Sequence, residues 1–216
     1  MSDSGNKLTV TDLRYSRGGN ILCEGLSFTL APGELKVIRG ANGSGKSTLL
    51  QILAGLRKPD SGQICWAGGA ITEHENYPNL VCYIGHKHGM RPALSVFDNL
   101  RFWARMAGGE LLLGAALNFF DLESLADTPF EALSAGWKQR VHLARLIISP
   151  APLWLLDEPS SNLDAHATEL LQSLLATRLE RGGMIVMASH ARIEGRTEQG
   201  SIDLDPVSPH TMSGAV

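Results

Sequence analysis

The chain has 216 residues, of which 44% are hydrophobic, and its 19 Lys and Arg against 22 Asp and Glu give a formal net charge of −3. This length predicts one domain of ordinary size with a proper core, and the slight acidic excess excludes a mainly electrostatic nucleic-acid binder. The sequence has no run of 18 apolar residues and no basic start followed by an apolar stretch, so we expect a cytosolic chain without a bilayer span or a secretory signal.

The first third of the chain is predicted to be rich in strands, with one helix. Segments that alternate apolar and polar side chains, or form short apolar runs between turn residues, are typical of strands. Such segments lie at residues 8–15, 21–30, 35–39, 63–67 and 80–84. Between the third and the fourth of these, apolar residues recur at helical spacing from Lys46 to Leu56, and the turn at 58–62 ends that helix.

The middle of the chain, residues 85–150, is predicted to be a helical lobe inserted into an α/β core. Ser95 followed by Asp98 predicts a capped helix start, and the apolar run after them ends at two glycines, 108–109. A second helical pattern covers residues 137–148. We find no strand pattern between them.

The last third returns to strands and helices in alternation. Strands are expected at 153–156, 184–188 and 201–205, and a helix at 165–180. The polar segment after residue 200 predicts a weak strand and a frayed end. We therefore expect a single domain whose parts are the α/β core (1–84 and 151–200), the helical lobe (85–150) and a C-terminal tail (201–216).

The cysteines point to no covalent framework. Cys23, Cys65 and Cys82 are odd in number and form no C-x-x-C pair, which disfavours a disulfide scaffold or a four-ligand zinc site. We expect buried free thiols.

A glycine-rich segment, GANGSGKST at residues 40–48, follows the third predicted strand and opens the first helix. It matches G-x-x-x-x-G-K-S/T, in which glycines turn backbone N–H groups toward one anion and the helix N-terminus adds positive charge. Lys46 would bring a full charge to the β- and γ-phosphates, and the Ser47 hydroxyl can ligate Mg²⁺. The alternative is a glycine-rich surface turn. The residues expected to bind nucleotide here are Gly40, Asn42, Gly43, Ser44, Gly45, Lys46, Ser47 and Thr48.

Two acids, Asp157 and Glu158, follow the predicted buried strand at 153–156. Burying adjacent carboxylates without a counter-charge is costly, and a metal ion would relieve that cost. We expect Asp157 to be the Mg²⁺ partner and Glu158 to position or activate the attacking water. The alternative is an exposed acidic turn after an edge strand.

A third polar group follows the strand at 184–188, which ends at Ser189 and His190. Ligands of open α/β sheets bind at the carboxyl ends of the strands, so Gly40, Asp157 and His190 are expected to converge on one crevice. A lone histidine is usually only a satisfied polar residue, but this one stands where a γ-phosphate would be sensed.

Taken together, these motifs resemble those of the ATP-binding cassette (ABC) ATPases along nearly the whole chain. Residues 133–140, LSAGWKQR, are similar to the family's LSGGQ signature, and residues 161–164, SNLD, to its D-loop. His190 resembles the switch histidine, and Tyr15 the aromatic residue that stacks on adenine. The resemblance implies an α/β P-loop NTPase (RecA-like) core with an antiparallel β subdomain and an inserted α-helical subdomain.

The resemblance also implies a mechanism that needs two copies of the chain. In this family two cassettes pair head to tail around ATP and Mg²⁺, so that the signature residues Ser134 and Gly136, together with the D-loop residue Asp164, close on the nucleotide held by the other copy. Hydrolysis then lets the dimer open. A chain with no span of its own would work with integral membrane transporter subunits, at the cytoplasmic face of the inner membrane.

Two positions depart from the family pattern. Ala135 replaces the second glycine of the signature, and His86 stands where most members carry the Q-loop glutamine. An imidazole can donate and accept as an amide does, though at fixed nitrogens, so His86 is a candidate catalytic residue near Mg²⁺ and water. The alternative is that His86 and His88 are solvated loop histidines.

Within the family, residues 85–86 and 89–102 look most like the ATP-binding subunit of the heme exporter of cytochrome c maturation. This resemblance implies ATP hydrolysis coupled to heme export or to release of heme from a carrier protein. Another ABC exporter remains open as an alternative. A cassette acting in translation or DNA repair would show two fused cassettes or a long coiled-coil insertion, a non-hydrolysing binder would lack Glu158 or His190, and a P-loop kinase would not explain residues 133–140.

Overall fold

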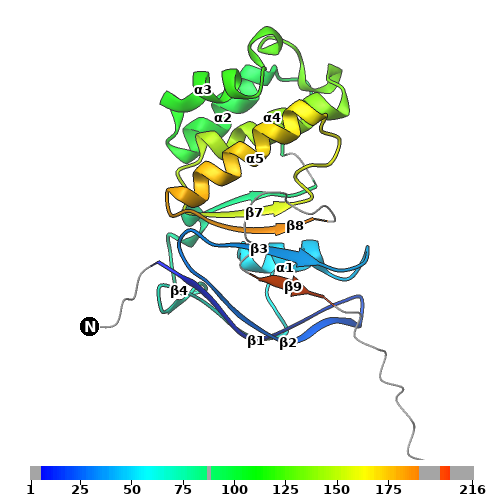
Figure 1. Ribbon diagram of the computed structural model, residues 1–216, viewed down its shortest axis with the longest axis vertical. Helices are drawn as coiled ribbons and strands as arrows, with labels where there is room; N and C mark the ends of the chain where they lie inside the picture. The colour runs from blue at the N-terminus through cyan, green and yellow to red at the C-terminus, as the bar shows by residue number, and fades with distance from the viewer. Residues whose placement is uncertain (1–5, 87–88, 190–199, 205–216) are drawn as a thin grey trace, which may run out of the picture.

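Two β-sheets and a group of helices form the layers of the structure, a computed structural model that describes residues 6–86, 89–189 and 200–204. Figure 1 shows the antiparallel sheet at the bottom, the parallel sheet in the middle and most of the helices above it, with α1 between the two sheets. Among the described residues, no helix combines the length and the apolar character needed to cross a bilayer.

The parallel sheet has five strands in the order β6-β7-β8-β3-β9. These strands are β3 (Leu35–Arg39), β6 (Val81–Ile84), β7 (Leu153–Asp157), β8 (Met184–Ala188) and β9 (Ser201–Asp203). Both faces of β7 and β8 are buried, and alternate residues enter different cores: Leu153 and Leu155 face α1 and the antiparallel sheet, whereas Trp154 and Leu156 face the upper helices. Burial on both faces is typical of parallel strands covered by helices.

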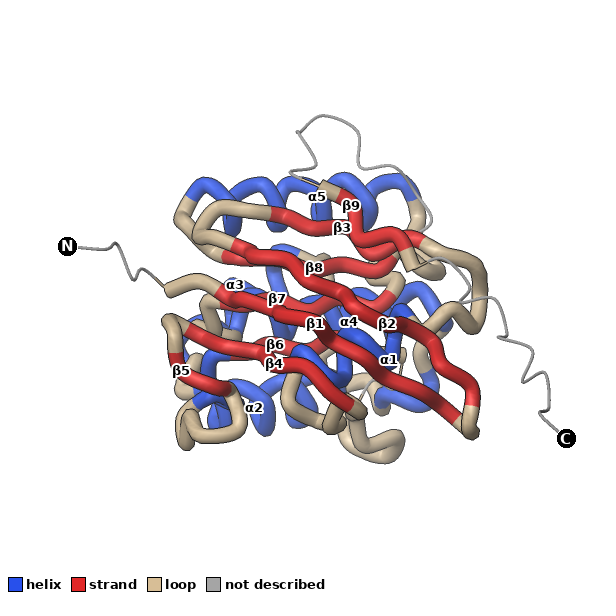
Figure 2. The backbone as a smooth tube through the Cα atoms, turned by 90° about the horizontal axis from the view of Figure 1, so that it is seen from below, coloured by secondary structure: helices blue, strands red, loops and turns tan. Residues whose placement is uncertain are grey.

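The antiparallel sheet has the order β2-β1-β4-β5. Its strands are β1 (Leu8–Arg17), β2 (Asn20–Leu30), β4 (Ser61–Trp66) and β5 (Gly69–Ala70). Figure 2 shows the two long strands β1 and β2 lying across the parallel sheet on this side of the molecule. The sheet therefore covers α1 from below and places the β1–β2 turn near the start of α1.

The described helices lie where the sequence predicts them, within three residues at each end, except for α3, for which the sequence predicts no particular helix within the helical lobe. They are α1 (Lys46–Leu53), α2 (Val96–Ala107), α3 (Leu113–Phe119), α4 (Ala135–Ile148) and α5 (Ala165–Glu180), with short 3₁₀ turns at Tyr77–Leu80, Glu110–Leu112, Glu123–Leu125 and Phe130–Ala132. The predicted cap of α2 is confirmed, since the Asp98 N–H donates to Ser95 Oγ at 3.0 Å. Gly108 ends α2 in the left-handed conformation, at φ 70°.

Three expectations need correction. The helix that starts at Lys46 ends at Leu53 rather than Leu56, and the Leu56 side chain is 67% exposed because the chain turns away at Gly55, where φ is 72°. The weak strand predicted at 201–205 is observed at 201–203, but it pairs with β3 and buries Ile202, so this segment belongs to the core sheet and not to the tail to which we assigned it. All three thiols are free as expected, but that of Cys65 is only partly buried.

Candidate functional site

The glycine-rich segment between β3 and α1 forms a loop around the Lys46 side chain, which is 8% exposed. The Lys46 Nζ donates to the carbonyl oxygens of Gly40, at 2.7 Å, and Ala41, at 3.1 Å. The first N–H groups of an α-helix have no partner within the helix. At the start of α1 no side chain caps them and the first turn contains no acidic residue, so they can bind an anion. The loop thus places one buried ammonium and one helix N-terminus at the same point.

The last glycine of this loop, Gly45, requires the absence of a side chain. Its φ is +102°, and a Cβ there would lie 3.1 Å from both Tyr15 Cε2 and Leu22 Cβ. The loop therefore rests directly on the antiparallel sheet, and the Tyr15 ring supports Gly45 from behind.

Substitution of Gly45 by alanine is expected to lower the free energy of unfolding by about 1–3 kcal/mol, because it adds a strained φ and a close contact. Gly43→Ala is the matched control: Gly43 also has a positive φ, +84°, but a Cβ there meets nothing within 4 Å. Urea unfolding of both variants measures the difference. Equal losses in the two variants would show that the packing of Gly45 against Tyr15 contributes no stability.

Asp157 ends β7 with its carboxylate in an environment that favours a cation. The residue is 4% exposed, and neither carboxylate oxygen has a hydrogen-bond partner among the described residues. The His86 Nε2 lies 3.4 Å from Asp157 Oδ2, while the His86 side chain itself is 67% exposed. A buried carboxylate without donors is costly, so a hard cation bound there would stabilise it.

Glu158 follows in an unusual backbone conformation. Its φ is +50°, which is uncommon for a residue other than glycine, and its N–H donates to the Ala188 carbonyl of β8 at 3.0 Å. The Ser161 N–H donates to the Glu158 carbonyl at 3.1 Å. These two hydrogen bonds hold Glu158 at the edge of the sheet, directly beyond the end of β7.

The loop and the acids line one cavity of about 860 Å³, a volume suited to a nucleotide. Parallel pairing in the order β7-β8-β3 brings the carboxyl ends of these strands to the same edge, so segments more than 100 residues apart in the chain meet. The predicted site residues that line the cavity are Asn42, Gly43, Gly45, Lys46, Ser47, Thr48, His86, Asp157 and Glu158. His190, predicted to join them, lies outside the described residues.

Several residues in the lining were not predicted. They are Arg17, Asn20, Leu22, Gln51 and Ser161. Gln51 lies one helical turn after Ser47, a spacing that the sequence shows, whereas the others depend on how β1, β2 and the loop after β7 fold. Gly40 and Ser44 are absent from the lining because they pack against each other: a Cβ on Gly40 would lie 2.5 Å from Ser44 Oγ.

The prediction that Tyr15 stacks on adenine is wrong. The residue is 1% exposed, and its hydroxyl points to the Gly45 carbonyl at 3.4 Å. Burial raises the pKa of the Tyr15 phenol far above its usual range, because desolvation penalises the phenolate, with a smaller contribution from Cys23. Both faces of the ring are thus covered by the protein core.

The signature residues lie outside this cavity, at the start of α4. Ser134 is the exposed N-cap of the helix, and its Oγ accepts from the Trp137 N–H at 3.4 Å. A Cβ on Gly136 would lie 2.9 Å from the Asn162 carbonyl oxygen, and the buried Gln139 donates through Nε2 to the Pro159 carbonyl at 2.8 Å. The signature therefore packs closely against the segment that follows Glu158, but it does not reach its own chain's phosphate loop.

Asp164 also lies outside the cavity, and its carboxylate forms hydrogen bonds with residues of its own chain. The Arg140 guanidinium donates to both of its oxygens, at 2.9 and 2.8 Å, and to Asp121 Oδ2 at 2.9 Å. As the N-cap of α5, Asp164 also accepts from the Ala167 N–H at 2.8 Å. The Ala167 hydrogen bond, followed by that of Arg140, lowers the pKa of Asp164. This carboxylate joins α4 to α5.

Because the pKa of Asp164 is lower in the folded chain than in the unfolded chain, its contribution to stability is present above about pH 4 and is lost as the pH falls further. Asp164→Asn is therefore expected to lower the urea midpoint at pH 7, and the gap to the parent protein should narrow below about pH 4. Asp127→Asn, at an exposed site, is the control. A difference in urea midpoint between Asp164→Asn and the parent protein that stays constant down to pH 2 would show that the ionised Asp164 carboxylate does not stabilise the fold.

Comparison with known proteins places these residues in context. The family model described as ABC transporter matches residues 23–161. The relatives include "Cytochrome c biogenesis ATP-binding export protein CcmA" of Paramagnetospirillum magneticum, 44% identical over 89% of this chain and 91% of the relative. The protein of the same name from Paracoccus denitrificans is 44% identical over 93% and 90%.

Solved structures agree on the fold. A putative ABC transporter ATP-binding protein from Pyrococcus furiosus superposes with a TM-score of 0.79 at 23% identity, over 92% of this chain and 97% of that chain. A structure described as the ATP binding subunit of an ABC transporter superposes with a TM-score of 0.76 at 28% identity, over 85% of this chain and 79% of that chain.

Proposed function

This chain belongs to the ABC transporter family, and from that membership we propose that it is the ATP-hydrolysing subunit of a CcmA-type exporter. The observation that carries the proposal is the single cavity lined by Lys46, Asp157 and Glu158. Its buried ammonium suits the β- and γ-phosphates, and Glu158 stands at the sheet edge where a terminal phosphate would be attacked. In this assignment the Glu158 carboxylate accepts a proton from the attacking water.

We further propose that Ser47 and Asp157 hold Mg²⁺ with the nucleotide. Their hydroxyl and carboxylate oxygens are the hard ligands that Mg²⁺ prefers, and the Asp157 oxygens, which accept no hydrogen bond from the described residues, fit a cation. Within the described ranges no group of three His, Cys, Asp or Glu side chains forms a separate metal site. Mg²⁺ in nucleotide sites usually takes few ligands from the protein and the rest from phosphate and water. When bound, Mg²⁺ neutralises charge on the phosphates.

The arrangement of the signature favours a dimer with a second copy, joined head to tail. Ser134 is exposed at a helix N-terminus, a position that can bind an anion, yet it lies outside the cavity of its own chain. A second chain would bring its own Ser134 and Gly136 to this cavity, so that ATP bridges the two copies. In this proposal Asp164 acts indirectly, by fixing α4 relative to α5.

His86 is proposed to orient water or Mg²⁺ at the open side of Asp157. Replacement by glutamine should retain most of the ATPase rate, because the amide also donates and accepts, whereas His86→Ala should lower the rate about tenfold. Phosphate release by the chain together with its membrane partners measures both. If His86→Ala has the parent rate, His86 is a solvated loop residue with no part in the reaction.

The names of the relatives, which refer to export and to cytochrome c biogenesis, support a proposal for the cargo. We propose that the chain sits at the cytoplasmic face of the inner membrane through integral membrane subunits, and that its ATP turnover drives heme export or release of heme from a carrier in c-type cytochrome biogenesis. Purification from membranes, followed by identification of the attached proteins and absorption spectroscopy for heme, tests this. Attached subunits of an unrelated exporter, without heme, would contradict the cargo and leave the ATPase assignment standing.

A further inference from the structure

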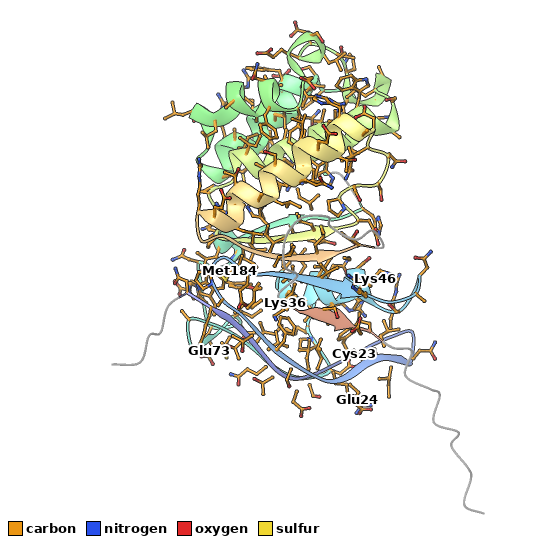
Figure 3. All side chains as sticks on the ribbon, in the orientation of Figure 1. Cys23, Glu24, Lys36, Lys46, Glu73 and Met184 are labelled. Carbon is orange, nitrogen blue, oxygen red and sulfur yellow. The ribbon has the colours of Figure 1, made fainter. Side chains whose placement is uncertain are left out.

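One end of the nucleotide cavity is formed by the turn between β1 and β2. Arg17, Asn20 and Leu22 line the cavity from this turn, whereas His86, Asp157 and Glu158 line it from the ends of β6 and β7. Figure 3 shows Lys46, at the start of α1, on the same side of the molecule as Cys23 in β2. With the phosphates at Lys46 and the terminal phosphate toward Asp157, the nucleoside must extend toward the β1–β2 turn.

This end of the cavity contains no aromatic ring to receive a base. Every Phe, Tyr and Trp of the chain falls within the described residues, and none of them lines the cavity. Tyr15, two residues before Arg17, is turned into the core beneath Gly45. The flat group available at this end is the guanidinium of Arg17.

We propose that the nucleobase stacks on the Arg17 guanidinium; this inference rests on the proposed function, since it assigns the base side of the same site. A guanidinium is planar and stacks on aromatic faces, including those of nucleobases. The Arg17 residue is exposed, and among the described residues nothing forms an ion pair or side-chain hydrogen bond with it, so it can lie flat on a base.

Stacking on a guanidinium has a consequence for specificity. Every base offers a π-face, so a stacking contact distinguishes purines only weakly. We therefore expect the chain to bind ATP and GTP with affinities within a few-fold of each other, with most of the affinity supplied by the phosphate loop.

Calorimetric titration of the full chain with ATP, GTP and inorganic tripolyphosphate, which has no base, tests the proposal. Arg17→Ala should weaken ATP binding about tenfold and leave tripolyphosphate binding within twofold. Arg17→Trp, which supplies a ring, should restore ATP affinity to the parent level or above. Arg14→Ala is the matched control: it removes the same charge three residues earlier, from an arginine paired with Glu24 at 3.4 Å, and should change neither affinity.

Three results would overturn the proposal. Parent ATP affinity in Arg17→Ala would show that the base does not rest on Arg17. Equal losses for ATP and tripolyphosphate would make Arg17 a phosphate contact. An Arg17→Trp variant as weak as Arg17→Ala would exclude stacking. In each case loss of ATP binding in Lys46→Ala shows that the nucleotide site itself stands, whereas a parent chain that binds no ATP would overturn the proposed function as well.

Discussion

Replacing Glu158 with glutamine is expected to lower kcat for ATP hydrolysis by about 10²–10⁴-fold while ATP affinity stays within a few-fold of the parent value. The amide keeps the size and shape of the side chain but cannot accept a proton from water. The backbone bonds that hold Glu158, to Ala188 and from Ser161, do not involve the side chain, so the variant should fold normally. Steady-state phosphate release measures kcat, and equilibrium ATP binding measures the affinity.

The same variant should accumulate a dimer with trapped ATP, because the bridging phosphates are not removed. Size-exclusion chromatography with saturating Mg²⁺ and ATP measures this species. Glu169→Gln, on the exposed side of α5, is the matched control and should neither slow hydrolysis nor trap dimers. A parent rate in Glu158→Gln would remove the role assigned to Glu158.

Loss of the Lys46 ammonium should weaken ATP binding itself. Truncating one partner of a buried, hydrogen-bonded charge pair costs about 2–5 kcal/mol, so Lys46→Ala is expected to reduce ATP affinity on the order of 100-fold or more. The free energy of unfolding of the nucleotide-free chain should fall by less, because the printed hydrogen bonds of Lys46 go to neutral carbonyls of the loop, those of Gly40 and Ala41. Calorimetry with ATP measures the change, and Lys58→Ala, in an exposed turn, controls for net charge. Unchanged affinity in Lys46→Ala would mean that the loop does not hold the phosphates.

The fold and the phosphate end of the site could be predicted from the sequence. At this end the strand and helix patterns predict the same arrangement as the residues that can bind phosphate and metal. The spacing of glycines before Lys46 makes sense only between a strand and a helix, and the acids after 153–156 follow a fully apolar run. Because the carboxyl ends of parallel strands lie at the same edge of the sheet, the glycine-rich loop and the two acids can meet there. Ser95 likewise marks the start of α2, since its hydroxyl and Asp98 satisfy the first turn.

The base end could not be predicted because it depends on a β-bulge. Leu8 and Val10 face the core, but at Asp12, where φ is 49°, the register shifts, so that Leu13 and Tyr15 face the core instead. Simple alternation counted from Leu8 would turn Tyr15 outward, whereas the bulge turns its ring into the core. The bulge is held by contacts across the sheet, such as the Asp12 N–H to Ser27 Oγ at 2.8 Å, which the sequence of one strand does not reveal.

Strand β9 was predicted only as a weak strand at 201–205, and its place in the core sheet could not be predicted. Three residues are too few to carry a periodicity, and its place beside β3 is fixed by tertiary pairing. The Arg140 pairs with Asp121 and Asp164 are equally invisible in sequence, because 19 and 24 residues separate the partners.

The contacts between α4 and the segment at 159–164 join the signature to the residues that follow Glu158 in the same chain. Gln139, Gly136 and Arg140 each touch this segment, which begins directly after Glu158. Since Ser134 starts the same helix, a nucleotide bound by Ser134 in the proposed dimer is expected to displace α4 and, with it, the backbone next to Glu158. Hydrolysis in the cavity of one copy should then depend on whether the cavity of the other copy holds ATP, so we expect the ATPase rate to rise sigmoidally with ATP concentration.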